Sequence, residues 1–223
     1  MVDLFPVWLS LRVSLLATVL TMAAGVPIAW LLAKRRFPGQ DLVSALVVTP
    51  LVLPPTVLGY YLLVLIGRRG PVGRVLAALN IELAFTWRAA VLAAAVGSIA
   101  LLIKTVEAGF ESIDARLEQA AQTLGHSEWS IFWTVSVPLA WRSILAGTVL
   151  AFCRALGDFG ITLMVAGNIP GRTQTLALAI YDAVESGDTT RAGVLALIVS
   201  AIALVAVFVM NRFGARFDEK AVS

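Results

Sequence analysis

Five long apolar stretches constrain what this chain can fold into. Each holds about 20 mainly apolar residues, which is the length that an α-helix needs to cross the hydrocarbon core of a bilayer. The stretches cover approximately residues 9–33, 42–66, 87–105, 144–166 and 192–210. We therefore expect one all-α integral membrane domain over residues 1–223, with about five transmembrane helices in contact with the lipid bilayer.

The composition supports a membrane protein and argues against other classes. Hydrophobic residues make up 59% of the chain and charged residues only 14%, whereas soluble domains carry about 25% charged residues. The net charge of +3 comes without a cluster of basic and aromatic residues, so we expect no binding to nucleic acid. The one cysteine, Cys153, excludes an intramolecular disulfide and is expected to be a small buried side chain.

Lysine and arginine positions predict how the chain crosses the membrane. With the N-terminus outside, the inner segments hold nine of them: Lys34, Arg35, Arg36, Lys104, Arg116, Arg142, Arg212, Arg216 and Lys220. The outer segments hold six: Arg68, Arg69, Arg74, Arg88, Arg172 and Arg191. Because positive residues are enriched in cytoplasmic loops, this bias places the long loop, about residues 106–142, in the cytoplasm. The first stretch exceeds a signal-peptide core of about 7–15 residues, so we expect a retained span.

The third apolar stretch carries small residues at helical spacing. Ala89, Ala93 and Gly97 fall on one stripe of the expected helix. Small residues at this spacing let helix backbones approach closely where lipid provides no hydrophobic driving force. The stripe therefore predicts a tightly packed helix bundle.

The long loop contains a polar, amphipathic segment, residues 119–138 (QAAQTLGHSEWSIFWTVSVP). Gly125 suits a helix C-cap, and apolar residues recur at helical spacing over residues 128–135. Pro138 is expected to stop the second helix before the fourth span. The pattern predicts two short helices that meet at Gly125 and bind a partner. A hairpin that lies on the inner membrane surface is the alternative.

This segment resembles the EAA loop of ABC importer permeases. The family pattern is Glu-Ala-Ala, three residues, Gly, nine residues and an apolar–x–apolar–Pro ending, whose matching positions are Ala120, Ala121, Gly125, Val135, Val137 and Pro138. Gln119 stands where the family has glutamate, and Glu118 lies one step earlier, which turns a helical side chain by about 100°. The resemblance implies that residues 118–138 couple the chain to an ATPase, with His126 as a polar contact.

Four segments resemble the molybdate permease subunits of type I ABC importers. They are KRRFPG (34–39), LVLPPTVLGYYLL (51–63), LEQAAQTLG (117–125) and RALGDFGITLMVAGNIPGRTQTL (154–176). The resemblance implies a multi-pass permease of the bacterial inner membrane that moves molybdate from periplasm to cytoplasm by alternating access, with a periplasmic N-terminus and a cytoplasmic C-terminus. Tungstate permeases and sulfate/thiosulfate permeases are similar enough to remain alternatives.

The resemblance also implies a set of partners. Two copies of this chain form the path, two ATP-binding subunits each grip one loop, and a periplasmic oxyanion-binding protein delivers the substrate. None of the three lysines follows a glycine, so the chain lacks the GxxxxGK[ST] phosphate loop. We therefore expect no enzymatic activity, no cofactor and no metal in this chain, with ATP and Mg²⁺ used by the partner ATPase. A membrane scaffold or sensor that recruits a partner without transport is the alternative from another class.

The second apolar stretch carries Thr49, Pro50, Pro54, Pro55 and Thr56. Proline removes a backbone donor and clashes with the carbonyl four residues earlier, so we expect a kinked or broken span. The freed backbone groups must face protein or a water-filled cavity, which favours a wall or gate of the translocation pathway. Thr49 and Thr56 are seven residues apart and are expected to share a face. A kink that serves packing alone is the alternative.

The fourth apolar stretch carries two ionisable residues, Arg154 and Asp158. Such residues are costly inside a membrane and usually face the bundle interior or water. Their four-residue spacing predicts an ion pair on one helix face, which serves either the structure or a gate. Gly157 and Gly160 bracket Asp158 and predict a thin or flexible region.

The segment after the fourth stretch is polar and rich in turn-forming residues. Pro170 and Gly171 predict a turn within residues 168–175 (NIPGRTQT). The family resemblance implies that outer loops receive the binding protein, which makes Arg172 a candidate contact; a solvated turn is the alternative. Residues 173–184 are too few and too polar to span a bilayer, so we expect a re-entrant or interfacial helix there.

Overall fold

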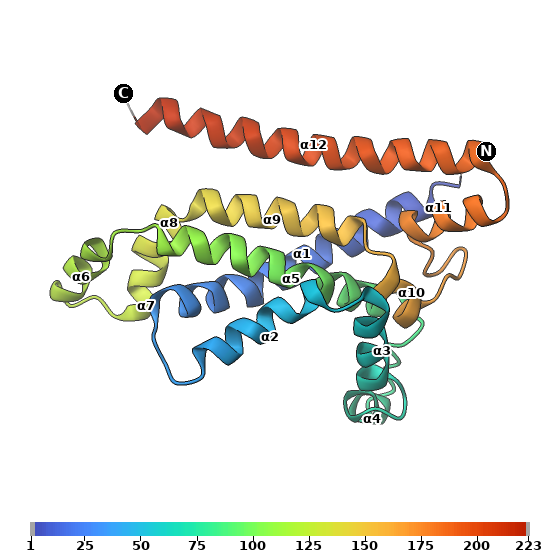
Figure 1. The fold of residues 1–223 in the computed structure, drawn as a ribbon, viewed down its shortest axis with the longest axis horizontal. Coiled ribbons are helices and arrows are strands. Elements are labelled where there is room, and N and C mark those ends of the chain that lie inside the picture. The colour runs from blue at the N-terminus through green and yellow to red at the C-terminus, as the bar shows by residue number, and fades with distance from the viewer. Residues whose placement is uncertain (1–2, 222–223) are drawn as a thin grey trace.

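Helix α5 (Trp87–Glu111) lies at the centre of the bundle, where it packs against both α1 (Phe5–Lys34) and α9 (Trp141–Leu156) (Figure 1). The predicted stripe of Ala89, Ala93 and Gly97 is buried. A Cβ atom on Gly97 would lie 2.9 Å from Ile161 Cδ1, so a larger residue there would force the Ile161 side chain to move. The expected tight packing through small residues is therefore confirmed.

The computed structural model describes residues 3–221, with side chains as far as Arg212. The described residues form helices joined by turns, so the all-α class is confirmed. The other elements are α2 (Gln40–Val52), α3 (Pro55–Ile66), α4 (Pro71–Ala78), α6 (Ala115–Thr123), α7 (Glu128–Ile131), the π-helix η1 (Phe132–Ser136), α8 (Val137–Leu139), α10 (Gly160–Ala166), α11 (Leu176–Glu185) and α12 (Thr189–Ala221).

Among the described residues, three helices are each long and apolar enough to cross a membrane: α1, α5 and the part of α12 over Thr189–Arg212. Two bent pairs pass the same test together, namely α2 with α3 and Glu128–Leu139 with α9. If each bent pair counts as one span, the number of spans is five, which matches the expected number. Only 6% of the most apolar window of α12 is buried, so this helix offers its apolar surface to lipid or to another chain.

The predicted break in the second span is confirmed. Helices α2 and α3 meet at 113°, and the residues between them are Leu53 and Pro54. Pro55 begins α3, where a missing backbone N–H costs no hydrogen bond. The expectation that Thr49 and Thr56 share a face is wrong, because that argument needs one continuous helix and the two threonines lie on opposite sides of the bend.

The fourth span is shorter than the predicted helix over residues 144–166. Helix α9 ends at Leu156, and α10 begins at Gly160 after a three-residue break. Asp158 accounts for this break, because its Oδ2 accepts hydrogen bonds from Thr162 N (3.0 Å) and Thr162 Oγ1 (2.6 Å) and so caps the first turn of α10. The 16 residues of α9 extend about 24 Å, somewhat less than the hydrocarbon core of about 30 Å.

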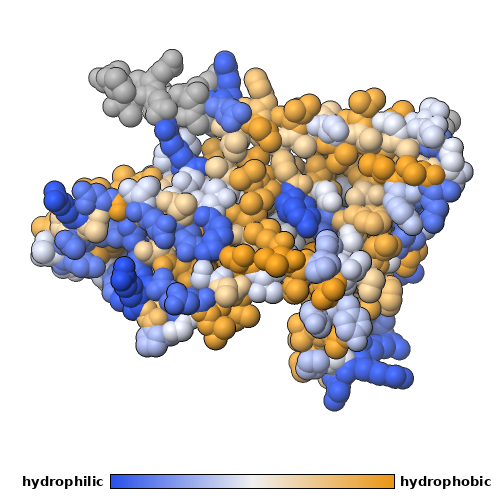
Figure 2. Space-filling model, viewed as in Figure 1, coloured by the Kyte–Doolittle hydropathy of each residue, from blue (hydrophilic) through white to orange (hydrophobic). Residues whose placement is uncertain are grey.

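An apolar band separates two polar ends of the bundle. Figure 2 shows mainly hydrophobic residues over the middle of one face, apart from a small hydrophilic patch, with hydrophilic residues over α6 to α8 and at the tip of α4. Along α1, no charged residue lies between Arg12 and Lys34, a distance of about 33 Å along the helix axis. Two of the nine cations assigned to the inner side, Arg216 and Lys220, lie outside the residues whose side chains are described.

Candidate functional site

Residues 118–138, here called the coupling segment, lie at the end of the bundle where α1 and α5 finish (Figure 1). Helix α5 stops at Glu111, and a separate helix, α6, begins at Ala115. Asp114 caps this new helix, since its Oδ1 accepts from Arg116 N at 2.9 Å. The cap explains why the two helices are distinct.

Gly125 forms the predicted junction between α6 and the helices that follow. Its φ of +85° lies in the left-handed region, which glycine adopts most readily. Gly125 N donates to Gln122 O (2.9 Å) and His126 N donates to Ala121 O (3.2 Å), which is the Schellman arrangement of a helix C-terminus. No atom lies within 4 Å of a Cβ placed on Gly125, so within this chain the glycine serves backbone conformation and no close contact.

Pro138 does not stop the second helix, contrary to the prediction from the sequence. It lies inside α8, and the chain changes direction two residues later at Ala140, where the axis turns by 76° into α9. The preceding η1 winds as a π-helix, with Val137 N donating to Phe132 O. This wider winding avoids the α-helical hydrogen bond that proline cannot make and the clash that proline would cause.

The aromatic residues of the coupling segment divide into a buried and an exposed set. Phe132 is 1% exposed and packs against Trp30 and Phe110, with ring centroids 5.3 and 6.4 Å away. Trp129 is 63% exposed and Trp133 is 54% exposed. Phe132 therefore attaches the segment to α1 and α5, while the two tryptophans remain available to contact another protein. Tryptophan is enriched among the residues that contribute most to protein–protein binding.

Glu118 and Gln119 have different surroundings. The Glu118 side chain is 13% exposed, and its carboxylate lies 3.2 Å from Lys34 Nζ and accepts a hydrogen bond from Ser136 Oγ at 2.7 Å. Trp30 Nε1 donates to the same Ser136 hydroxyl at 3.3 Å. Gln119 is exposed. The glutamate is thus engaged inside the chain, and the residue at the family's glutamate position faces outward.

The other residues of the predicted docking motif also differ in exposure. Ala120, His126 and Pro138 are exposed, whereas Val135 and Val137 are half-buried and Ala121 is buried. His126 Nδ1 lies 3.2 Å from Ser130 Oγ, within the same segment. The accessible surface of the motif therefore centres on the end of α6 and the turn at Gly125.

The predicted pathway residues of the second and fourth spans meet where both spans are broken. Helix α3 packs against α10, and a Cβ on Gly160 would lie 2.8 Å from Pro55 Cβ. Nearby, a Cβ on Gly59 would lie 2.7 Å from Met164 Cβ. Thr49 donates to Ala45 O (2.8 Å) in its own helix. Of the predicted pathway residues in the second span, Thr49 and Pro50 are half-buried in α2. The other three are exposed, namely Pro54, Pro55 and Thr56.

Arg154 and Asp158 form the predicted ion pair, with Arg154 Nη1 3.3 Å from Asp158 Oδ1. Asp158 lies beyond the end of α9, so the two residues do not share one helix as the sequence suggested. The Asp158 side chain is 2% exposed, and both of its oxygens have partners, one in Arg154 and the other in Thr162. The pair thus joins the ends of α9 and α10.

Arg172 lies in the predicted turn between α10 and α11. Gly171 has a φ of +71°, and Arg172 N donates to Ile169 O at 3.1 Å. The arginine is exposed. The short helix α11 that follows covers most of residues 173–184, and its 10 residues extend only about 15 Å, too little to span a bilayer.

Residues 25–222 match the family described as "Binding-protein-dependent transport system inner membrane component". The chain belongs to this family. The matched region includes the coupling segment, both broken spans and Arg172. All the candidate site residues of this permease therefore lie within the part of the chain that matches the family.

The permease is similar to proteins named for molybdenum and for sulfate transport. It is 44% identical over 205 residues to the molybdenum transport system permease protein ModB of Escherichia coli (strain K12), across 91% of this chain and 90% of that protein. It is 41% identical over 202 residues to ModB of Haemophilus influenzae, across 88% of each chain. Identity falls to 34% over 206 residues with the sulfate transport system permease protein CysT of Escherichia coli (strain K12), across 92% of this chain and 74% of that protein.

Solved ABC transporters share the fold of this permease. The inward-facing MetNI methionine ABC transporter aligns with a TM-score of 0.74 at 19% identity, across 95% of this chain and 94% of that chain. A bacterial alginate ABC transporter aligns with a TM-score of 0.75 at 15% identity, across 96% and 78%. The chain therefore has the type I ABC importer permease fold.

The sequence did not single out Lys34 and Ser136 as partners of Glu118. Lys34 was used only for its charge, because it ends the first apolar stretch, and Ser136 occupies the unspecified position of the apolar–x–apolar–Pro ending. Only the meeting of α1 with the coupling segment brings the two side chains to one carboxylate. The position of a lysine at the end of the first apolar stretch was the one available signal.

Proposed function

We propose that this chain is the membrane-spanning permease subunit of an ATP-driven ABC importer that carries molybdate from the periplasm to the cytoplasm. The observation that carries the proposal is the 44% identity to a molybdenum permease across 91% of this chain. The family match, which includes the coupling segment, supports it. Tungstate is chemically close to molybdate and is expected to use the same path.

The coupling segment is proposed to bind the ATPase through its accessible side, which includes Gln119, Gly125, Trp129 and Trp133. Movement of the ATPase would displace the segment as a unit, because Phe132 and the contacts of Glu118 fasten it to α1 and α5. The bend at Ala140 sets the direction in which α9 is moved. The access side changes only if ATP binds one of the two states more tightly than the other.

The translocation pathway is proposed to run along the contact between the two broken spans. Pro55 and Gly160 lie against each other there, so a shift of α3 relative to α10 would open or close the path. Arg154 is already paired with Asp158, which weakens its attraction for an oxyanion. This weak attraction suits a conduit, since tight binding would slow release into the cytoplasm.

The proposed assembly contains two copies of this single-domain chain, because one coupling segment per chain must serve two ATPase subunits. ATP and Mg²⁺ are used by those subunits, and no cofactor is assigned to this chain. A periplasmic oxyanion-binding protein is proposed to dock on the outer loops, with Arg172 as one contact. This arrangement requires the inner membrane, a periplasmic N-terminus and a cytoplasmic C-terminus.

Uptake of labelled molybdate by proteoliposomes that contain the assembled complex tests the proposed function. We expect ATP-dependent uptake that excess tungstate reduces strongly and excess sulfate reduces little. Sulfate is the second candidate substrate, because the permease is 34% identical to a sulfate permease across 92% of this chain. Competition by sulfate as strong as that by tungstate would overturn the choice of molybdate.

The alternative from another class is a membrane scaffold or sensor that recruits a partner without transport. The same proteoliposomes separate it from a transporter. A scaffold would assemble with the ATPase and show no ATP-dependent accumulation of any oxyanion tested. The family match favours transport, because the family is described as a component of transport systems.

A further inference from the structure

A cavity of about 390 Å³ lies at the end of the bundle opposite the coupling segment. It is lined by the first turns of α1, by the start of α5 with the loop that leads into it, and by the turn after α10. Each of these three elements contributes one arginine, namely Arg12, Arg88 and Arg172. At about 30 Å³ per water molecule, the cavity has room for a small anion with part of its hydration shell.

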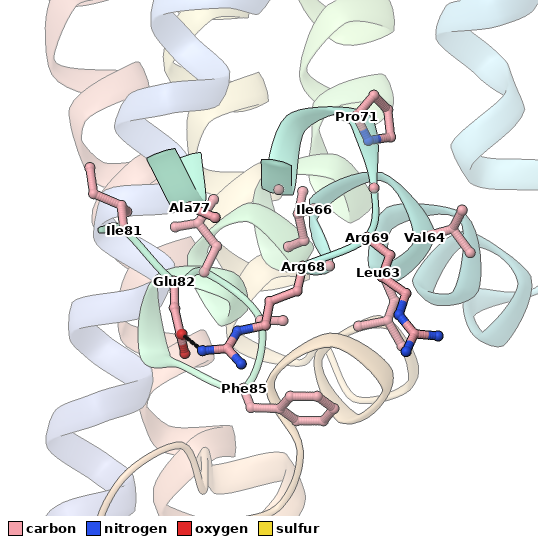
Figure 3. Close-up of a pocket in the computed structure, with 15 residues that line it drawn as sticks. Leu63, Val64, Ile66, Arg68, Arg69, Pro71, Ala77, Ile81, Glu82 and Phe85 are labelled. Carbon is pink, nitrogen blue, oxygen red and sulfur yellow. Dashed lines mark hydrogen bonds and ion pairs between the residues drawn. The ribbon is translucent and has the colours of Figure 1, made fainter. Parts of the chain in front are cut away.

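The cavity carries an excess of positive charge. Among the described residues, Arg12, Arg88 and Arg172 have no carboxylate within ion-pair distance. Glu82 is the acidic residue in the lining, and it is already paired with Arg68. Figure 3, a close-up of the neighbouring cavity, shows this ion pair. No carboxylate among the described residues therefore neutralises the three arginines of the cavity.

The α5 helix adds to this positive field. Thr86 is the N-cap of α5, and Trp87 and Arg88 form its first turn; all three residues line the cavity. The N-terminus of a helix carries a partial positive charge of about half a unit and presents backbone N–H groups that bind anions. The helix end thus adds to the larger positive charge of the three arginines.

The cavity is held in place by contacts between its walls. The Arg12 guanidinium lies 3.9 Å from the centroid of the Trp87 ring, in a cation–π contact. Phe85 N donates to Val165 O at 2.9 Å, which ties the loop before α5 to α10. Leu176 N donates to the Ser10 hydroxyl of α1 at 2.7 Å. These contacts fix the three arginine-bearing elements relative to one another.

We propose that this cavity is an anion-binding site that receives the oxyanion at the outer end of the permease before it enters the pathway. The identity of the anion as the transported substrate rests on the proposed function. A carboxylate of a binding protein or a lipid phosphate would meet the same cations. The arrangement favours a small free anion, because arginines from three elements surround a recess instead of lining a flat surface.

Equilibrium binding of labelled molybdate to the purified permease–ATPase complex, in lipid nanodiscs without the binding protein, tests this site. The wild-type complex is expected to bind molybdate saturably and more weakly as salt is added. A variant with Arg12→Gln, Arg88→Gln and Arg172→Gln should bind at least about tenfold more weakly, because each replacement removes one unit of attracting charge. Arg69→Gln, an exposed arginine outside this cavity, is the matched control and should bind normally.

Unchanged molybdate binding by the triple variant, or no saturable binding by the wild type, overturns the site. The docking of the empty binding protein is measured on the same preparations. If the triple variant loses docking and keeps molybdate binding, the arginines recognise protein carboxylates and the proposal is wrong. Uptake by the wild-type complex is the separate test of the proposed function, since failed uptake contradicts transport whatever the cavity binds.

Discussion

Glu118 is held by residues from two other elements, Lys34 of α1 and Ser136 of η1. Lys34 Nζ also donates to Ile113 O at 3.3 Å, so the lysine joins α1 both to the turn after α5 and to α6. The Lys34 and Glu118 side chains are each 13% exposed, and a charge so little hydrated depends on its partner. We infer that this pair keeps the coupling segment in a fixed position on α1.

We predict that Glu118→Leu or Lys34→Met alone lowers the stability of the assembled complex by about 2 kcal/mol, because each leaves a poorly hydrated charge without its partner. The double variant should lose less than the sum of the two single losses. Thermal unfolding of the complex measures this. Gln119→Ala, at the neighbouring exposed position, should change stability by less than about 0.5 kcal/mol.

The same variants test how the pair affects transport. A coupling segment that is loosened from α1 should lower the amount of molybdate taken up for each ATP hydrolysed, with ATP hydrolysis itself retained. Additive losses in the double variant, or unchanged coupling in Glu118→Leu, would show that the ion pair does not position the segment.

Gly125 provides a second prediction at the residue scale. Replacement by alanine should cost about 1 kcal/mol locally, because the φ of +85° is strained for a residue with a Cβ. Gly125→Trp should add a bulky group on the proposed ATPase-facing side. We expect both variants to insert normally and to uncouple ATP hydrolysis from uptake, with the larger effect in Gly125→Trp. Normal uptake by Gly125→Trp would contradict the docking role.

These two residues show what the sequence predicts well and what it does not. The Gly125 turn follows from local chemistry, since a glycine after a run of helix formers is a common helix end. The partners of Glu118 come from the end of the first span and from the π-helix, and no local pattern connects such distant segments. The sequence correctly showed that Glu118 and Gln119 face different ways, because one step along a helix turns the side chain by about 100°.

At the scale of elements, the contact between α3 and α10 depends on glycine. We predict that Gly160→Val lowers stability by about 1–3 kcal/mol and reduces uptake, because its Cβ would lie 2.8 Å from Pro55 Cβ and force the helices apart. Gly157→Ala is the matched control, since its Cβ would meet only Cys153 O at 3.6 Å. Thermal unfolding and uptake measure both effects. Equal behaviour of the two variants would show that close packing at Gly160 is unimportant.

The two broken spans were not equally predictable. The break between α2 and α3 follows from clustered prolines, which act through backbone geometry alone. The break after α9 falls where Gly157 and Gly160 predicted a thin or flexible region, but the sequence did not show that Asp158 would hold the first turn of α10. At Pro138 the sequence predicted a helix end that the structure does not have. The rule that proline ends a helix assumes α-helical winding, and η1 winds as a π-helix.

At the scale of the whole molecule, α1 carries one functional region at each end. Arg12 lines the outer cavity and Lys34 holds the coupling segment, and they are about 33 Å apart along the helix. This separation is close to the thickness of the hydrocarbon core of a bilayer, about 30 Å. This match is consistent with the proposal that the two regions lie at opposite membrane surfaces, where α1 would connect them.

The orientation of the whole permease leads to the last prediction. In a background with Cys153→Ser, Thr190→Cys near the start of α12 should react with a membrane-impermeant maleimide added outside intact cells, because that end is proposed to be periplasmic. Gln122→Cys in α6 should react only after the membrane is opened. Both positions are exposed within the chain, so a difference in labelling reports the side of the membrane. The reverse pattern would place the coupling segment outside, where no ATP-consuming subunit operates, and would contradict the transport mechanism proposed above.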